Sequence, residues 1–301
     1  MGDLFTHSIG LQRITFGETF GFNIVDIANP FDYRDFLFKD PIDRRIETWS
    51  LVSSAELPWG TADIIFTPKS QNPIWPKTYG DLKISTENKT TSEYGFRLNK
   101  TFDSGLDISI FTYRHQNRLP SFLAQTSFSG VTLKPMAYDV TSMGVFGSQS
   151  IGEGLVLRWE MIHMNKIHEP FLTITDGERY SAKKADLQAM VVGADYALTD
   201  LNLGLQLHTT NHDEDSWQTD KTPRWFSSLI TWQISSNLST ELFYYQGIGN
   251  RDQQQQVRLI YGLNDNLVVG IDHIKVRAKD NGFLQLYNGH QSIGFDLELT
   301  F

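Results

Sequence analysis

The chain has 301 residues, no cysteine and a formal net charge of -9 at pH 7. The absence of cysteine excludes disulfide frameworks and thiolate metal sites, and the acidic balance argues against nucleic acid as a partner. No segment approaches the roughly 20 consecutive apolar residues that a membrane-spanning helix needs. No shift in composition marks a boundary, so we expect a single domain over residues 1–301.

Short segments in which apolar and polar residues alternate follow one another along the whole chain. Alternation with a period of two is the repeat of a β-strand that has one apolar and one polar face. It predicts fourteen strands, over 8–16, 46–57, 61–68, 93–102, 106–114, 136–148, 155–166, 186–197, 201–210, 225–234, 238–246, 254–263, 267–276 and 289–301. The pattern is weak in 136–148 and 186–197, and its phase slips near Asp272 and His273, which predicts a bulge there.

The connections between these strands alternate between short turns and long loops. Turns such as 103–105, 198–200 and 264–266 contain Asp, Ser, Thr, Gly and Asn, whereas loops such as 17–45 and 69–91 exceed twenty residues. Outer-membrane β-barrels have this asymmetry, with short periplasmic turns and long extracellular loops. We therefore expect an all-β fold, an antiparallel transmembrane barrel of about fourteen strands; the alternative is a soluble sandwich with one solvated face.

The polar face of the predicted strands carries charge. In 201–210 four leucines alternate with Asn, Gly, Gln and His, and in 155–161 Arg158 and Glu160 alternate with large apolar residues. If the apolar face meets lipid, the charged face lines a lumen. Because only alternate residues then face lipid, the mean hydropathy of the chain stays low, at -0.31. The predicted lumen-lining residues are Asp63, Glu93, Arg97, Asp107, Arg158, Glu160, Arg258, Asp272, Asp296 and Glu298. The acidic excess favours a mild cation preference; alternatively, these residues form ion pairs that brace the barrel.

The last predicted strand ends in Phe301, and every odd residue from Ile293 onwards is large and apolar. A terminal aromatic that closes such a strand resembles the C-terminal signal of outer-membrane barrels, which assembly machinery recognises. The N-terminus, Met1 to Leu4, has neither the basic region nor the apolar run of an export signal. We expect a mature chain that was given a start Met, or a fragment.

The loop 17–45 is too apolar to be a solvated hairpin tip. Long loops with their own packing are often functional, so we expect this one to fold into or across the barrel mouth and to narrow the pore. Its charged residues would place opposite charges at the constriction, where their field orients dipolar solutes; alternatively, they pair with one another and hold the loop closed. They are Asp32, Arg34, Asp35, Asp40, Asp43, Arg44 and Arg45.

Part of this loop carries a family resemblance. The segment Asn29-Pro30-Phe31-Asp32-Tyr33-Arg34-Asp35-Phe36, followed by Asp40-Pro41-Ile42-Asp43-Arg44-Arg45, resembles a stretch in a poorly characterised family of proteobacterial outer-membrane porin-like proteins. The resemblance covers residues 10–70 and implies a location in the bacterial outer membrane and a role in transport. It supplies no catalytic residues.

No motif points to a cofactor, a metal or an enzyme. His208, His212, Asp213, Glu214 and Asp215 lie close together, but they lack a calcium-loop pattern, and an ordinary acidic loop is the better interpretation. No nucleophile elbow or phosphate-binding loop is present. The sequence predicts an outer-membrane channel for passive diffusion of small polar solutes, in contact with outer-membrane lipid. The alternatives are a transporter for hydrophobic molecules and a closed barrel that acts as an adhesion or receptor surface.

Overall fold

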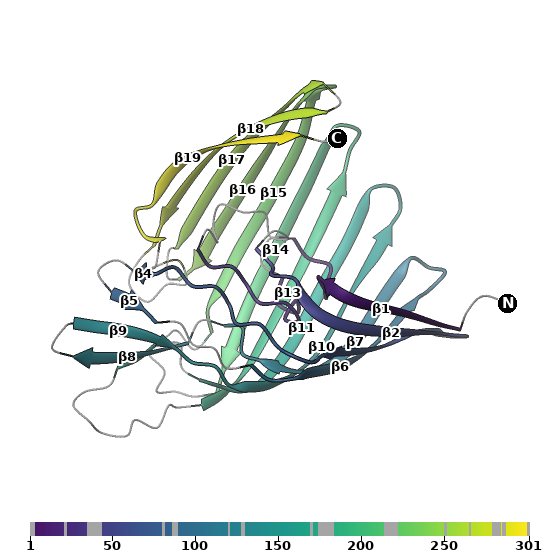
Figure 1. Ribbon diagram of the computed structural model, residues 1–301. Helices are drawn as coiled ribbons and strands as arrows, with labels where there is room; N and C mark the ends of the chain where they lie inside the picture. Colours follow the sequence, from purple (N-terminus) through teal and green to yellow (C-terminus); the bar gives the residue numbers. More distant parts are fainter. Residues whose placement is uncertain are drawn as a thin grey trace.

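The computed structural model describes residues 4–20, 23–34, 44–79, 82–85, 90–119, 121–127, 130–168, 171–173, 184–213, 222–249, 252–264, 266–278, 284 and 287–299. Fourteen strands form one curved sheet in which every neighbouring pair is antiparallel (Figure 1). In order across the sheet they are β1 (Phe5–Gln12), β2 (Thr48–Leu57), β3 (Gly60–Thr67), β6 (Glu93–Thr101), β7 (Leu106–Gln116), β10 (Asp139–Ile151), β11 (Leu155–His168), β13 (Lys184–Ala197), β14 (Leu201–His212), β15 (Arg224–Ser235), β16 (Leu238–Ile248), β17 (Gln253–Asn264), β18 (Leu267–Arg277) and β19 (Gln291–Leu299).

The predicted fourteen-stranded antiparallel architecture is confirmed, and each sheet strand overlaps its predicted range. The strands β1 and β19 stand at the two ends of the hydrogen-bonded order, and no ladder joins them among the described residues. The predicted bulge near Asp272 is wrong, because β17 and β18 pair without interruption there and their register shifts between Gly262 and Asn264 instead.

Five further strands lie within segments whose sequence predicted only loops. They are β4 (Thr78–Tyr79), β5 (Leu82–Ile84), β8 (Phe122–Ser127), β9 (Gly130–Pro135) and β12 (Phe171–Thr173), and they form a small sheet in the order β12-β8-β9-β5-β4. Strands of two to six residues are too short to show a clear period of two. In Figure 1 the labelled strands of this small sheet gather at one end of the large sheet, away from the short hairpin turns.

The outer face of the large sheet is apolar. Large side chains such as Ile64, Phe96, Met161 and Leu205 are 40–60% exposed on it. Aromatic residues stand out at both ends of the strands, as they do in the girdles of outer-membrane barrels. They are Trp59, Phe102, Tyr196, Trp232 and Tyr261 near the short turns, and Trp49, Phe66 and Tyr94 near the long loops. Within the described residues no helix is long and apolar enough to cross a membrane.

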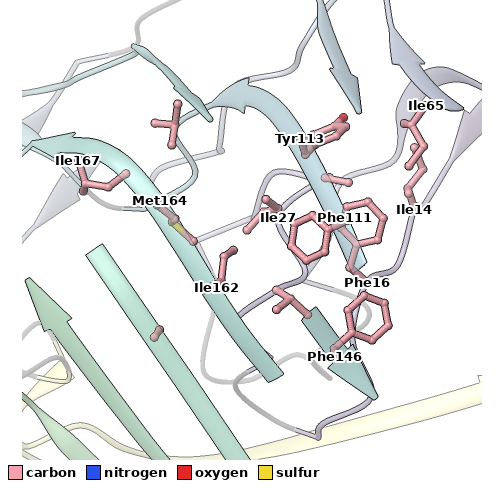
Figure 2. Packing of buried hydrophobic residues seen from close by; sticks show 14 of the residues in the cluster. Ile14, Phe16, Ile27, Ile65, Phe111, Tyr113, Phe146, Ile162, Met164 and Ile167 are labelled. Carbon is pink, nitrogen blue, oxygen red and sulfur yellow. The ribbon is translucent and has the colours of Figure 1, made fainter. Parts of the chain in front are cut away.

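The inner face near the long loops is also apolar, which the strand pattern did not predict. Phe111, Phe146, Ile162 and Met164 point inward from β7, β10 and β11 and form one buried cluster with side chains that precede β2 (Figure 2). Because both faces of β10 and β13 carry apolar residues in this half, their sequence alternation is weak.

The turn between β10 and β11 depends on a glycine. Gly154 has a φ of +92°, and a Cβ there would lie 2.5 Å from the Ala197 carbonyl oxygen. Gly152 in the same turn has a φ of +57° and nothing within 4 Å of that position. We expect Gly154→Ala to lower the free energy of unfolding by roughly 2–3 kcal/mol and Gly152→Ala by roughly 1 kcal/mol. Urea titration in detergent micelles measures both; equal losses would contradict the steric argument.

Candidate functional site

The lumen of the sheet contains a segment of the chain that follows β1, residues 13–20 and 23–34, which we call the inner segment. Phe16 is 1% exposed and stacks on Phe111 of β7 with 4.9 Å between the ring centroids. Val25 and Ile27 belong to the same buried cluster (Figure 2 labels Ile27). The observed β1 therefore ends at Gln12 and not at residue 16, because Ile14 and Phe16 pack inside the sheet.

A buried carboxylate fixes the inner segment to the wall. Glu160 of β11 is 0% exposed. Its Oε1 accepts hydrogen bonds from the backbone N–H of Glu18 and Thr19, both at 2.9 Å, and from the Thr19 hydroxyl at 2.7 Å. Its Oε2 accepts one from the Ile24 N–H at 3.0 Å. Gly17 has a φ of +90°, and a Cβ there would collide with Glu160, so glycine is required for this close approach.

A buried ion pair holds the other side of the inner segment. Arg118 Nη2 lies 2.7 Å from Glu93 Oε1, and the two side chains are 3% and 0% exposed. The same guanidinium donates hydrogen bonds to the backbone carbonyls of Ile27, Ala28 and Gln71. Arg118 thus compensates the Glu93 charge and satisfies carbonyl groups that the inner segment buries.

Two further contacts close the base of the inner segment. The Asn29 side chain accepts a hydrogen bond from Ile14 N at 2.7 Å and donates to Ile46 O at 2.8 Å. Arg45 forms an ion pair with Asp26 at 3.0 Å and lies over the Phe31 ring, 3.7 Å from its centroid. Burial raises the pKa of the Asp26 carboxyl, and the Arg45 guanidinium opposes that rise.

The charges predicted at the constriction occupy different environments. Asp32 is buried and binds Arg34 through Nε at 3.0 Å and Nη2 at 2.8 Å, while the Arg34 side chain is 54% exposed. Arg44 is 7% exposed, and Arg45 is committed to Asp26. The remaining three, Asp35, Asp40 and Asp43, lie outside the described residues.

The inner face nearer the short turns carries charged residues that pair across strands. Asp63 of β3 binds Arg97 of β6 at 2.8 Å, and Arg158 of β11 binds both Asp195 of β13 and Glu18 of the inner segment. The side chain of Arg97 is 20% exposed and that of Arg158 is 25% exposed. These groups are partly open to the lumen and are neutralised locally.

In strands β17 to β19, charged residues of the inner face also pair across strands. Arg258 of β17 reaches past β18 to Asp296 of β19 at 2.8 Å. Asp272 stands on the same inner face of β18, and Glu298 follows Asp296 two residues later on β19. Asp107 lies on the inner face of β7, in phase with the buried Phe111. By strand alternation all ten predicted lumen residues share the inner face, and Glu93 and Glu160 are held in the buried contacts of the inner segment.

Apolar residues of the inner segment also pack in the second half. Tyr33 stacks on Trp75 with 4.3 Å between ring centroids and joins a cluster with Tyr245, Ile274 and Val276. Phe31 packs against the same cluster. Phe31 is thus partly buried against this cluster; Phe22 and Phe36 fall outside the described residues.

In the part of the chain that the structure describes, no group of three or more His, Cys, Asp or Glu residues could hold a metal ion. The His212 and Asp213 of the predicted acidic loop belong to that part, whereas Glu214 and Asp215 do not.

Sequence reasoning missed several residues that build the site. Arg118 and Asp26 were assigned no role, and Asn29 entered only as part of the family resemblance, yet each contributes to the position of the inner segment. Arg118 offered one signal: it lies two residues after the end of β7, in the run His-Gln-Asn-Arg, where a barrel strand reaches the mouth.

Solved structures with a similar chain path are bacterial outer-membrane proteins. OccAB4 of Acinetobacter baumannii superposes with a TM-score of 0.52 at 10% sequence identity, over 98% of this chain and 70% of that chain. The chain has the fold of a bacterial outer-membrane porin. In barrels of this fold the apolar outer face meets lipid.

Two other porin-fold structures resemble the chain less closely. An anion-selective porin from Comamonas acidovorans has a TM-score of 0.49 at 12% identity, over 85% of this chain and 75% of its own. OccK8 of Pseudomonas aeruginosa has a TM-score of 0.48 at 11% identity, over 78% and 68%. No family model and no curated protein sequence matches the chain.

Proposed function

We propose that the chain is an outer-membrane channel for passive diffusion of small polar solutes, and that it has no enzymatic role. The observation that supports the proposal is the inner segment, which packs against the inner face near the long loops while charged, partly exposed side chains lie on the inner face near the short turns. A narrow polar passage admits small hydrated solutes and resists large or apolar ones.

The proposal assigns each group of residues a part. The inner segment with residues 17–45 forms the constriction, the inner-face charges form a polar vestibule, and residues 1–301 act as one barrel domain. Outer-membrane lipid surrounds the barrel, and assembly machinery recognises the C-terminal strand that ends at Phe301. Phe301 lies outside the described residues.

Single-channel recording in planar bilayers tests the proposal. The refolded protein is expected to give stable, ohmic conductance steps in potassium chloride, because an open polar path of fixed width conducts in proportion to voltage. Heat-denatured protein at the same concentration controls for detergent leakage. Absence of steps from protein that inserts into the bilayer in folded form would reject the channel.

Ion selectivity provides a separate prediction. Without the buried Glu93 and Glu160, the predicted inner-face set still has five acids against three arginines, so we expect potassium to be preferred over chloride. The double variant Asp296→Asn, Glu298→Gln should shift the reversal potential in a potassium chloride gradient towards zero. Glu153→Gln, an acid in an exposed short turn, is the matched control and should leave it unchanged. A reversal potential that favours chloride in the unmodified protein would contradict the preference and leave the channel itself standing.

A further inference from the structure

Three buried polar atoms on the inner face of β14 to β17 have no hydrogen-bond partner among the described residues. They are Nδ1 of His208 on β14, Nε1 of Trp225 on β15 and Oε1 of Gln254 on β17. The side chains of His208 and Gln254 are 0% and 1% exposed. A buried donor or acceptor without a partner is costly, so a wall that only had to pack would be more stable with apolar side chains at these positions. The three residues therefore need an explanation beyond packing.

Strand register brings the three residues into one row. The strands β14, β15, β16 and β17 are consecutive in the sheet (Figure 1). His208 lies opposite Trp225, and their rings stack with 5.4 Å between the centroids and 15° between the planes. The Trp225 ring centroid is 6.3 Å from that of Tyr245, and Tyr245 lies directly opposite Gln254. We call His208, Trp225 and Gln254 the polar row.

The neighbours of His208 determine which of its ring nitrogens carries the hydrogen. One orientation of the Gln206 amide satisfies both of its ends: its nitrogen donates to Phe20 O at 2.9 Å and to His208 Nε2 at 3.3 Å, and its oxygen accepts from Phe20 N at 2.8 Å. Ser227 Oγ lies 3.2 Å from the same Nε2. Because an amide nitrogen only donates, Nε2 is an acceptor and the hydrogen is on Nδ1. The polar row thus offers two N–H donors and one carbonyl acceptor.

Aromatic side chains flank the polar row. Trp225 packs against the cluster that contains Tyr33 and Tyr245, and Phe31 and Trp75 pack against the same cluster. Trp225, Phe31 and Trp75 are only partly buried, so their rings form the margin of that cluster. Aromatic surface with a few fixed polar atoms is the usual composition of a small-molecule site.

We propose that the polar row binds the hydroxyl groups of a neutral sugar ring and, on the basis of the proposed channel function, selects such solutes in the lumen. The three groups carry no formal charge, so a carboxylate or an ammonium group would meet no counter-charge in the row. A hydroxyl both donates and accepts, and it therefore pairs with the N–H groups as well as with the carbonyl.

The burial of these atoms sets a condition for binding. Because the side chains of His208 and Gln254 are closed to water, the aromatic margin must move aside before a solute reaches the row. The hydrogen bonds that the row then forms favour the opened arrangement, since a ligand shifts a protein towards the state that it binds better. The apolar face of the sugar ring lies on the displaced aromatic side chains.

Saturation-transfer NMR measures the weak binding expected of a transported solute. The probe is methyl glucoside, added to the full chain in micelles of a detergent without a sugar headgroup, and micelles without protein are the blank. The double variant Trp225→Phe, Gln254→Met removes one donor and the acceptor. It should bind the probe roughly 25-fold more weakly, since each neutral hydrogen bond contributes about fivefold.

A matched double variant controls for the chemistry of the substitutions. Trp232 and Gln188 are exposed residues of the outer face, and Trp232→Phe, Gln188→Met makes the same two changes there. This variant should bind methyl glucoside as the unmodified chain does. Equal affinity of the unmodified chain and the Trp225→Phe, Gln254→Met variant would overturn the proposal.

Stability distinguishes a binding role of the row from a structural one. Gln254→Met keeps the side-chain volume and removes an acceptor that has no partner among the described residues. It should therefore unfold at no lower urea concentration than the unmodified chain, while it binds the sugar about fivefold more weakly. A lower unfolding midpoint together with unchanged sugar binding would show a structural role and overturn the proposal.

Two further probes test the class of solute. Methyl glucuronide has the same ring with a carboxylate, and tetrahydropyran is the ring without hydroxyls. Both should bind at least about tenfold more weakly than methyl glucoside, because the first buries an unpaired charge and the second forms no such set of hydrogen bonds. Tighter binding of the glucuronide, or equal binding of tetrahydropyran, would contradict a site for neutral sugars.

Conductance separates this proposal from the proposed function. Sugar binding to a protein that gives no conductance steps would keep the site and reject the channel. Conductance steps without saturation transfer to methyl glucoside would reject the site and leave the channel standing. Circular dichroism and heat-dependent gel mobility verify that each variant is folded.

Discussion

Replacing Glu160 with Leu is expected to increase the single-channel conductance and to make the open level noisy. The carboxylate accepts four hydrogen bonds from Glu18, Thr19 and Ile24. A leucine of similar size removes every acceptor and leaves buried donors unsatisfied, at roughly 1–3 kcal/mol each. Because about 1.4 kcal/mol changes a population ratio tenfold, we expect the loss to release Glu18, Thr19 and Ile24 from the wall for part of the time.

Two variants make the conductance result specific. Glu160→Gln keeps one acceptor oxygen and should give an intermediate conductance, since some of the hydrogen bonds persist. Glu153→Gln changes the same residue type in an exposed turn and should behave as the unmodified protein. If Glu160→Leu folds and conducts with an unchanged, quiet step, the inner segment does not set the width of the passage.

Loss of Arg118 should produce the largest fall in stability. Arg118→Ala leaves Glu93 as an uncompensated charge with 0% exposure, and breaking a buried pair from one side costs about 3–5 kcal/mol. It also removes the donor to the carbonyls of Ile27, Ala28 and Gln71. The free energy of unfolding, measured by urea titration in detergent micelles with tryptophan fluorescence, is expected to fall by at least the lower figure.

A second change should restore much of that loss. The double variant Glu93→Gln, Arg118→Met removes both charges and keeps side-chain volume, so we expect it to recover at least half of the stability. Arg114→Ala is the matched control, because its ion pair with Asp139 is half-exposed and contributes about 0–1 kcal/mol. An Arg118→Ala variant as stable as Arg114→Ala would show that the buried pair does not anchor the inner segment.

The two predictions share one physical basis. The inner segment buries backbone N–H and C=O groups that have no strand partner, and such groups must be satisfied when water is excluded. Glu160 supplies acceptors on one side and Arg118 supplies donors on the other. The inner segment is therefore held by complementary charged side chains from β11 and from the residues after β7.

Strand positions were predictable where the two faces of a strand differ. In β14, Leu205 and Leu207 are about half exposed on the outer face while Gln206 and His208 are buried inside, so the alternation in sequence matches the structure. Prediction was weaker for β10 and β13, where Phe146 and Val191 are apolar and point inward. Such residues look the same in sequence whether they meet lipid or the inner segment.

The wrong prediction of a bulge at Asp272 has the same cause: the sequence does not tell an apolar residue that faces lipid from one that packs inside. The sequence of β18 changes phase because Ile274 and Val276 are buried against Tyr33 and Tyr245 on the inner face, while Ile271 is exposed outside. Two apolar environments on opposite faces of one strand imitate a register shift. Only the position of Tyr33, which lies more than two hundred residues away in the sequence, distinguishes the two cases.

The sequence by itself determined the strands, their antiparallel order and the charged inner face, because a period of two and the length of each connection are local properties of the chain. Only the tertiary structure decided which charges meet. Glu93 pairs with Arg118 and Glu160 binds backbone of the inner segment, whereas the sequence left open whether these acids line a lumen or form bracing ion pairs. Hydrogen bonds and ion pairs depend on distances of about 3 Å, and the curvature of the whole sheet sets those distances.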